Sequence, residues 1–343
     1  MIRQGVWTTA ATHALALLRR LGAPPQPETA LQALIKTLAI VPDMPTWVQI
    51  ETTNRCNFSC AMCPRVLHKL PAEDMPMERF MGIMERLPLP QASLITLFGL
   101  GEPLLHEDTF TMVREVKRRG FRAAFTTNGV LLSHEVNEKI LSSGLDYIRI
   151  SVDDDGFGDS TGALHRAASA VIERTEALLA FRAGQTSPEI LWNVVASASS
   201  APAIGSIIAK AAQIGMDGVN IINLVSRFSS IAPIPEDRRA TLFRQWHRQG
   251  RDLGIRIQST FADRFGLPRF FHRRGLECPQ LLGYAYVTMD GDVTPCCHLP
   301  RLIMGNLFTE SLHDIWHARR FRRFRRVYRS SPTCRDCRLL TWR

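Results

Sequence analysis

Apolar runs rich in β-branched residues recur at regular intervals from residue 46 onward, and a helical pattern follows each one. These runs predict strands over 47–52, 93–98, 122–126, 146–152, 190–196 and 218–224. Apolar positions at helical spacing predict helices over 76–86, 108–119, 132–143, 163–183, 202–214 and 236–252. Repeated strand–helix units predict an α/β fold with a parallel sheet and right-handed crossovers. Six such units favour a partial (βα)6, TIM-like barrel.

The pattern changes on both sides of this central part. It predicts three regions: an N-terminal helical extension over 1–45, the partial barrel over 46–255 and a C-terminal α+β domain over 256–343. Within the first region, an amphipathic pattern predicts a helix over 8–21 and a second helix over 28–39. Within the last region, residues 284–295 are typical of a β-hairpin with an Asp-Gly turn.

Three cysteines, Cys56, Cys60 and Cys63, follow the first predicted strand with the spacing C-x3-C-x2-C. Three thiolates leave one iron of a 4Fe–4S cube without a protein ligand, and an open iron can bind a substrate. A structural zinc site with His68 as fourth ligand is an alternative. A disulfide framework fits less well, because eight cysteines in 343 residues are sparse and clustered.

The segment from Glu51 to Arg65, which contains this triad, resembles the cluster loop of the radical S-adenosylmethionine (SAM) enzymes. Three later segments resemble the family's next motifs in the same order: 99–103 is similar to its GGEP motif, and 126–129 and 150–153 are similar to its next two strand-end motifs. The sequence departs from the family at Met62, where an aromatic residue is common, and after Asp153, where relatives often read Asp-Gly-Ala. Neither departure removes a cluster ligand.

The resemblance implies a 4Fe–4S cluster on the triad, with SAM bound to its open iron. SAM contacts are then expected from residues of the later motifs: Gly99, Gly101, Glu102, Asn128, Ser151 and Asp153. All the motifs follow the ends of the first four strands, where parallel α/β folds carry their active sites. Arg149 shares strand parity with Ser151 and Asp153, so its guanidinium is a further candidate for SAM or the substrate.

Four more cysteines in the C-terminal region provide a second set of metal ligands: Cys278, Cys296, Cys334 and Cys337. The last two form a C-x2-C pair, which also suits structural zinc. The region resembles the SPASM and twitch extensions of radical SAM enzymes. Because the sequence has only six residues after Cys337, the shorter twitch form, with one auxiliary 4Fe–4S cluster, is expected.

Cys297 is left over beside Cys296, and three roles stay open for it. It can replace Cys296 as a ligand, or be a small buried residue, which is the usual fate of a free cysteine. It can also donate a hydrogen atom to a substrate radical, because an S–H bond is weak.

The net charge of +10 is concentrated at the C-terminal end of the chain. Residues 301–343 contain eleven arginines and three acidic residues, so they carry +8 of the total. The pattern of 319–326 predicts an amphipathic helix whose basic face is simply solvated, or docks an acidic flavodoxin- or ferredoxin-type electron donor. An anionic membrane or nucleic acid is a third alternative, but no nucleic-acid motif accompanies the arginines. No apolar run has the roughly 18 residues of a membrane span, and thiolate clusters favour the cytoplasm.

These observations predict a radical SAM enzyme that takes a hydrogen atom from a small polar natural-product intermediate, such as a sugar or aminocyclitol. The outcome is dehydrogenation or epimerisation. Maturation of a ribosomal peptide, by epimerisation or cross-linking, is an alternative. So is a non-catalytic iron–sulfur or RNA-binding protein.

Overall fold

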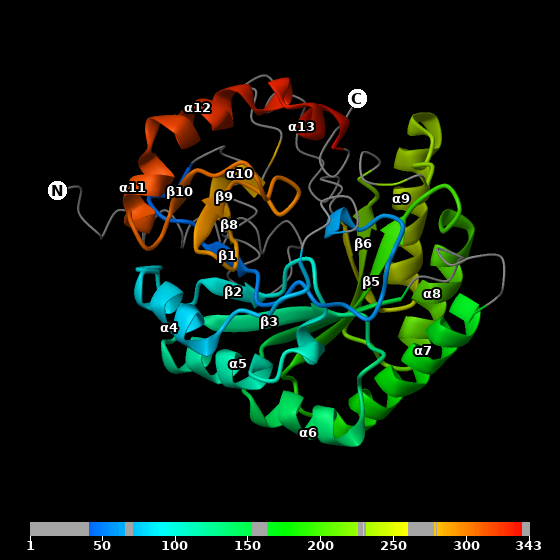
Figure 1. Ribbon diagram of the computed structural model, residues 1–343. Coiled ribbons are helices and arrows are strands. Elements are labelled where there is room, and N and C mark those ends of the chain that lie inside the picture. Colours follow the sequence, from blue (N-terminus) through cyan, green and yellow to red (C-terminus); the bar gives the residue numbers. More distant parts are fainter. Residues whose placement is uncertain are drawn as a thin grey trace, which may run out of the picture.

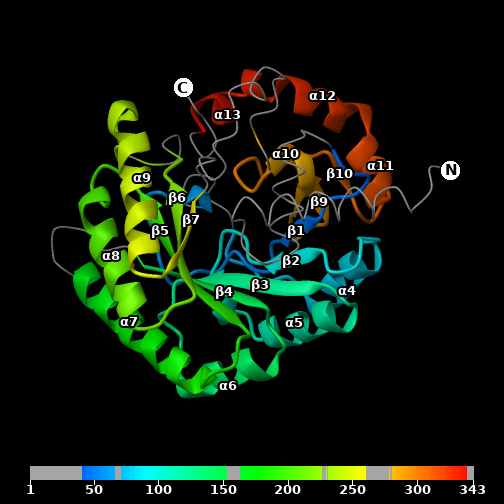
Figure 2. The same cartoon turned by 180° about the vertical axis from the view of Figure 1, so that it is seen from behind.

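The computed structural model describes residues 41–65, 71–152, 163–225, 229, 231–259, 278 and 280–337. A single ten-stranded sheet forms the centre of this part, with the strand order β10-β9-β8-β1-β2-β3-β4-β5-β6-β7. The sheet curves strongly, and helices cover its outer side as an arc (Figures 1 and 2). The predicted α/β fold with a parallel sheet and a partial barrel is confirmed. The N-terminal helices predicted over 8–21 and 28–39 lie outside the described residues.

The barrel strands pair in parallel from one to the next along the chain. Their bounds are β1 Trp47–Ile50, β2 Leu94–Leu97, β3 Arg122–Thr127, β4 Tyr147–Ser151, β5 Glu189–Ala196, β6 Gly218–Asn223 and β7 Arg256–Ser259. The first six coincide with the predicted strands, whereas the seventh follows the predicted domain boundary at 255. Ile257 is the one apolar residue among the four of β7, so no apolar run marks this strand in the sequence.

The outer helices follow the predicted ones closely. They are α4 Met77–Glu85, α5 Thr109–Arg118, α6 His134–Ser142, α7 Ala163–Arg182, α8 Ala201–Gln213 and α9 Glu236–Asp252. Local signals fix several ends: the Ser133 hydroxyl accepts a hydrogen bond from the Val136 amide at the start of α6. Gly120 and Gly144, with φ angles of 80° and 78°, follow α5 and α6 in the left-handed conformation that ends helices.

The C-terminal region continues the barrel sheet. Strand β8 (Tyr284–Val287) pairs in parallel with β1 and antiparallel with β9 (Asp292–Thr294), and the short β10 (Gly305–Asn306) completes this edge. The predicted hairpin is confirmed, with Gly291 at φ 79° in its turn. Short helices precede and follow these strands: α10 Gln280–Gly283, α11 Leu312–His317, α12 Arg319–Val327, η5 Tyr328–Ser330 and α13 Pro332–Asp336.

The two faces of the barrel sheet differ in polarity. Side chains of one parity, such as Val48, Ile148 and Ile221, are fully buried against the helices in one apolar core. Side chains of the other parity line the inner face, away from the helices. Many of these are polar, among them Gln49, Arg149 and Asn220. Because the helices cover the apolar outer face, the polar side chains of the inner face are the ones available to a ligand.

Candidate functional site

The cysteine triad lies in the loop that leaves the C-terminal end of β1. The backbone of Thr53 forms a bridge with Asp74, which returns the chain toward α4. Within the loop, the Cys63 amide donates to the Cys60 carbonyl at 3.0 Å, and the Phe58 amide donates to Cys56 Sγ at 3.4 Å. Cys56 also lies close enough to Cys63 and Glu102 for both to raise the pKa of its thiol, although burial is the larger cause.

Arg55 and Asp74 fasten this loop to its surroundings. The Arg55 guanidinium pairs with Asp74 at 2.6 Å and donates to the Leu105 carbonyl at 2.5 Å. The Arg55 carbonyl in turn accepts from the Glu102 amide at 2.7 Å. The cysteine loop and the segment after β2 are therefore joined by backbone and side-chain contacts.

Glu102, in the segment that resembles the GGEP motif, is only 2% exposed. Its carboxylate accepts hydrogen bonds from the Leu104 amide (3.1 Å), the Thr127 hydroxyl (2.7 Å) and the Asn128 amide (2.7 Å). Burial nevertheless raises the pKa of Glu102. The carboxylate therefore clamps the ends of β2 and β3 together, and its backbone rather than its side chain is available to a ligand.

The neighbouring glycines allow backbone segments to approach closely. A methyl group on Gly101 would collide with the Thr53 carbonyl oxygen and lie 2.6 Å from that of Arg55. A methyl group on Gly99 would lie 2.6 Å from Glu51 Cγ and 2.8 Å from the Tyr286 hydroxyl. Both positions therefore require glycine.

Asn128, after β3, contacts the cysteine loop directly. Its Nδ2 donates to Asn57 Oδ1 at 2.7 Å, between the first two cysteines of the triad. Ser151 is the last residue of β4. Of the residues predicted at this site, Gly99, Gly101, Glu102, Asn128 and Ser151 thus follow or end adjacent strands at the same rim. Asp153 and His68 lie outside the described residues.

The four distal cysteines gather at one place. Burial, together with the nearby Cys337 and Cys334, raises the pKa of Cys278 to about 12. Cys278 in turn lies close enough to Cys296 to raise the pKa of that thiol. Residues from positions 278, 296, 334 and 337 therefore surround a common region, as the sequence predicts for one metal site.

The distal cysteines also approach the barrel. Cys337 packs against Val225, just beyond the C-terminal end of β6, and Ile222 of β6 packs against the same valine. Tyr328, at the end of α12, lies beside the same cysteines, and burial together with their proximity raises the pKa of its hydroxyl. Both cysteine groups are therefore at the rim formed by the C-terminal ends of the barrel strands.

Cys296 and Cys297 are turned toward different neighbours. They share a hydrogen bond that lowers the pKa of Cys297 and raises that of Cys296. Cys297 also contacts the Tyr284 hydroxyl and lies near Glu51, whereas Cys296 lies near Cys278. Cys296 also lies near Tyr284 and Tyr286 of β8, so Cys297 is distinguished by its hydrogen bond with Tyr284 and its proximity to Glu51.

Glu51 and Tyr286 form a buried polar pair on the inner face, which the sequence analysis missed. Glu51 is 4% exposed and Tyr286 is fully buried. The Tyr286 hydroxyl approaches the Glu51 carboxylate, yet neither Glu51 Oε1 nor the Tyr286 oxygen meets hydrogen-bond geometry with a described residue. Burial raises the pKa of both groups. The parity of Glu51 with Gln49 was the available signal, but the partner is more than 230 positions away in the chain.

A row of four polar side chains crosses the inner face from β4 to β7. The pairing of the strands places Ser151, Asn193, Asn220 and Gln258 in register. Asn220 Nδ2 donates to Asn193 Oδ1 at 2.9 Å. We call these residues the inner row. Cys337 packs against Val225, which follows the end of β6, and Ile222, two residues beyond Asn220 on the same strand face, packs against Val225 as well. The inner row therefore lies on the strand that leads to the distal cysteines.

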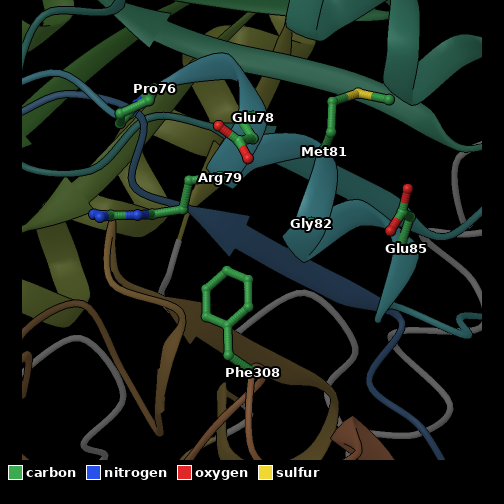
Figure 3. A pocket seen from close by; sticks show the side chains of 7 residues that line it. All are labelled: Pro76, Glu78, Arg79, Met81, Gly82, Glu85 and Phe308. Atoms are coloured by element: carbon green, nitrogen blue, oxygen red, sulfur yellow. The ribbon is translucent and has the colours of Figure 1, made fainter.

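A separate cavity of about 820 Å³ lies outside the barrel, along α4. Figure 3 shows Phe308 facing Met81, Gly82 and Arg79 across it. None of its lining residues belongs to either cysteine group or to the inner row.

Helix α12 carries the predicted basic face. Phe321 and Arg325 are buried on one side, where the Arg325 guanidinium stacks on the rings of Trp316 (3.9 Å) and Phe321 (4.0 Å). Arg322 and Arg326 are exposed on the other. The predicted amphipathic helix is confirmed.

The described residues form neither a single-ion metal site nor a membrane-spanning helix. No three His, Cys, Asp or Glu side chains there converge on a site for a single ion. A cubane cluster spaces its cysteine ligands more widely than one ion does. Among the same residues, no helix combines the length and the apolarity that crossing a membrane requires.

Comparison with protein families gives two matches. Residues 50–157 match the radical SAM superfamily, and residues 278–338 match SPASM, an iron–sulfur cluster-binding domain. These ranges contain the two cysteine groups described above.

Relatives of similar length exist. The chain is 26% identical over 319 residues to a tungsten-containing aldehyde ferredoxin oxidoreductase cofactor-modifying protein of Pyrococcus furiosus, covering 85% of this chain and 87% of the relative. It is 24% identical over 316 residues to an AdoMet-dependent heme synthase of Methanosarcina barkeri, covering 85% and 88%.

Solved structures share the fold. SuiB of Streptococcus suis, bound to the precursor peptide SuiA, has a TM-score of 0.67 at 16% identity and covers 98% of this chain and 83% of its own. BtrN, in complex with AdoMet and 2-DOIA, has a TM-score of 0.53 at 19% identity and covers 86% and 93%.

Proposed function

We propose that this chain, which belongs to the radical SAM superfamily and carries a C-terminal SPASM iron–sulfur domain, acts on a small, hydroxylated polar substrate held on the inner face of the barrel. The proposed reaction is dehydrogenation or epimerisation at a carbon that bears a hydroxyl group. The observation that carries the proposal is the inner row, Ser151, Asn193, Asn220 and Gln258. Its hydroxyl and amide groups both donate and accept hydrogen bonds, as recognition of a sugar-like molecule requires.

The cofactors are SAM, a SAM-binding 4Fe–4S cluster and an auxiliary SPASM cluster. We assign Cys56, Cys60 and Cys63 to the first cluster, which leaves one iron for SAM. We assign Cys278, Cys296, Cys334 and Cys337 to the auxiliary cluster. The donor set fits, because soft thiolates suit iron–sulfur clusters and each group gathers at the rim of the barrel.

The choice of Cys296 over Cys297 is supported by its neighbours. Cys296 lies near Cys278, whereas Cys297 contacts Tyr284 and lies near Glu51. Cys297 is therefore the thiol that faces the barrel, and we assign it as the candidate hydrogen-atom donor for epimerisation. Donation of its hydrogen atom to the substrate radical would leave a thiyl radical on Cys297, which one electron from the reduced auxiliary cluster and one proton from solvent would restore to the thiol.

Cys56, Cys60 and Cys63 would hold a cluster that, when bound and reduced, would supply the electron for reductive cleavage of SAM. The side chains then have defined tasks. Glu102 holds the ends of β2 and β3 together, and Asn128 positions the cysteine loop through Asn57. Ser151 and the amides of the inner row orient the substrate beneath the rim. The apolar core behind the sheet keeps these strands in register.

The test uses the anaerobically reconstituted, reduced protein with SAM and a panel of cyclitols, sugars and their amino derivatives. Stimulated release of 5′-deoxyadenosine identifies a substrate. Running the productive reaction in deuterated water then separates the two outcomes. Epimerisation places solvent deuterium on the product carbon, whereas dehydrogenation does not. If no member of the panel raises 5′-deoxyadenosine above the substrate-free rate while a peptide does, the proposal is wrong.

Peptide maturation is the second candidate, supported by the fold similarity to SuiB over nearly the whole chain. The same assay addresses it with peptides encoded beside the gene. Replacing Asn193 by Ala discriminates further, because a substrate bound by the inner row should lose turnover with Asn193→Ala. A peptide bound outside the barrel should not.

A further inference from the structure

Arg149 lies on the inner face of β4, one row deeper than the inner row. The pairing of strands places it between Thr126 of β3 and Leu191 of β5. Ser151 is two residues further along the same strand, a distance of about 6.6 Å at 3.3 Å per residue. A molecule that contacts Ser151 and Asn193 would therefore reach the Arg149 guanidinium with a substituent pointing into the barrel.

The Arg149 guanidinium lacks a hydrogen-bonded or ion-paired partner among the residues that the structure describes. Its Nε is buried and makes no hydrogen bond, and no hydrogen bond or ion pair joins this side chain to another described residue. Burial lowers the pKa of Arg149, and the nearby Arg256 lowers it further, while Glu189 raises it. A buried cation without hydrogen bonds is costly, so such a group is normally compensated by an anion.

The nearest acidic side chain is already engaged. Glu189 of β5 forms an ion pair with Arg256 of β7, two strands across the sheet. Arg122, the third arginine of this face, stacks over the Tyr147 ring at 4.3 Å. From the row of Arg149 to the N-terminal ends of the strands, the described inner face of β3 to β7 thus has three arginines and one glutamate. Arg149 is the arginine among them that has neither an ion pair nor an aromatic ring as partner within the described residues.

From these contacts we propose that Arg149 binds an anionic group, a carboxylate or a phosphate, on the substrate of this enzyme. The proposal rests on the proposed function and narrows it to a hydroxylated acid or a phosphate ester. The planar guanidinium offers paired N–H donors that match either oxyanion. The amides of the inner row, one layer above, then contact the hydroxyl groups of the same molecule. A substrate whose only charge is an ammonium group would be repelled from this position.

The test measures anion binding by the reconstituted enzyme saturated with SAM, without turnover. Sodium phosphate and sodium acetate are titrated separately at constant ionic strength, and the unfolding midpoint reports binding. At least one anion should stabilise the wild-type enzyme. Arg149→Met should weaken its affinity at least about tenfold, and Arg149→Lys about two- to fivefold, because lysine keeps the charge but loses the paired donors. The anion that binds identifies the source of the charge.

The matched control is Arg114→Met, which removes an exposed arginine of α5 and should leave the affinity unchanged. Three results would overturn the proposal: neither anion stabilises the wild type, Arg149→Met and Arg149→Lys bind as the wild type does, or the Arg149 variants lose affinity for SAM itself. The last would make Arg149 a SAM ligand. If Arg149→Met does not fold, Arg149→Lys decides alone. An enzyme that turns over only neutral substrates would refute this inference while leaving the proposed function intact.

Discussion

The cysteines proposed to hold the SAM-binding cluster lie within eight residues of one loop, whereas those proposed for the auxiliary cluster span sixty residues, from 278 to 337. The loop is held by local contacts, such as the bridge between Thr53 and Asp74 and the bond from Asn128 to Asn57. The distal group is assembled by tertiary structure, through the pairing of β8 with β1 and the packing of Cys337 on the end of β6.

The two groups also differ in the electrostatic surroundings of their thiols. Burial raises the pKa of the Cys56 thiol, whereas burial together with the nearby Cys337 and Cys334 raises the pKa of the Cys278 thiol to about 12. An open loop with three ligands suits a cluster that must bind SAM. A closed set of four ligands suits a cluster that accepts or passes electrons and binds nothing else. Removing one group of cysteines should therefore leave the other cluster in place.

The largest effect is expected from replacing all three loop cysteines. In the Cys56→Ala, Cys60→Ala, Cys63→Ala variant, iron and sulfide should fall from about eight to about four of each per chain, because one cubane of four irons is lost. Release of 5′-deoxyadenosine should be abolished. Since the loop is exposed and locally held, the unfolding temperature should change little. Cleavage of SAM by this variant would disprove the assignment of the triad.

Replacing the distal pair should have the complementary result. Cys334→Ala with Cys337→Ala should also halve the iron, but SAM cleavage should persist while product formation is lost. Metal ligation couples to folding where ligands come from distant segments. The unfolding temperature should therefore fall by about 5 °C or more, as a loss of roughly 2–3 kcal/mol produces in a chain of this size. Cys297→Ala is the control: if it instead removes the auxiliary cluster, Cys297 and not Cys296 is the ligand.

The contrast between the groups also separates what the sequence predicts from what it does not. Spacing within a short loop identifies the triad, and apolar runs identify β1 to β6, because both signals are local. The joining of β8 to β1 depends on contacts between residues more than 230 positions apart, so Glu51 and Tyr286 had no detectable connection. Strand parity is enough to predict that Arg149 and Ser151 share one face of a strand. The inner row cannot be predicted in this way, because it depends on the register of four paired strands. Adjacent cysteines such as Cys296 and Cys297 are indistinguishable until their neighbours are known.

A smaller effect is expected at Glu102, which supports the triad loop without being a ligand. Glu102→Ala would leave the Asn128 amide and the Thr127 hydroxyl without their acceptor. The free energy of unfolding should fall by about 2–4 kcal/mol, since each buried unpaired group costs about 1–3 kcal/mol. Glu102→Gln should lose about half as much. Affinity for SAM should drop with both, whereas auxiliary iron should be retained. Glu135→Gln, at an exposed carboxylate of α6, is the control and should behave as the wild type.

The smallest effects concern two carboxylates with opposite pH dependence: Glu51, which faces β8 of the C-terminal region, and Asp74, which holds the triad loop. Burial raises the pKa of Glu51, on the side facing Tyr286. Its contribution to stability is complete below the ordinary glutamate pKa and is lost as the pH rises through the raised value. Asp74 holds the triad loop: burial raises its pKa, but hydrogen bonds from Thr53 and Arg55 outweigh burial and lower it. Its contribution is present above the ordinary aspartate pKa and is lost as the pH falls through the lowered value.

Glu51→Gln should therefore match the wild type in acid and become relatively more stable toward neutral pH. Asp74→Asn should match it in acid and become relatively less stable toward neutral pH. Unfolding temperatures measured between pH 4 and pH 8 should diverge in these opposite directions, by a few degrees at most. Parallel profiles for the two variants would show that Glu51 is ionised and compensated in the folded protein. Glu51, which faces β8, would then resemble Asp74 of the triad loop in being charged and paired. The inference that burial keeps Glu51 protonated would be wrong.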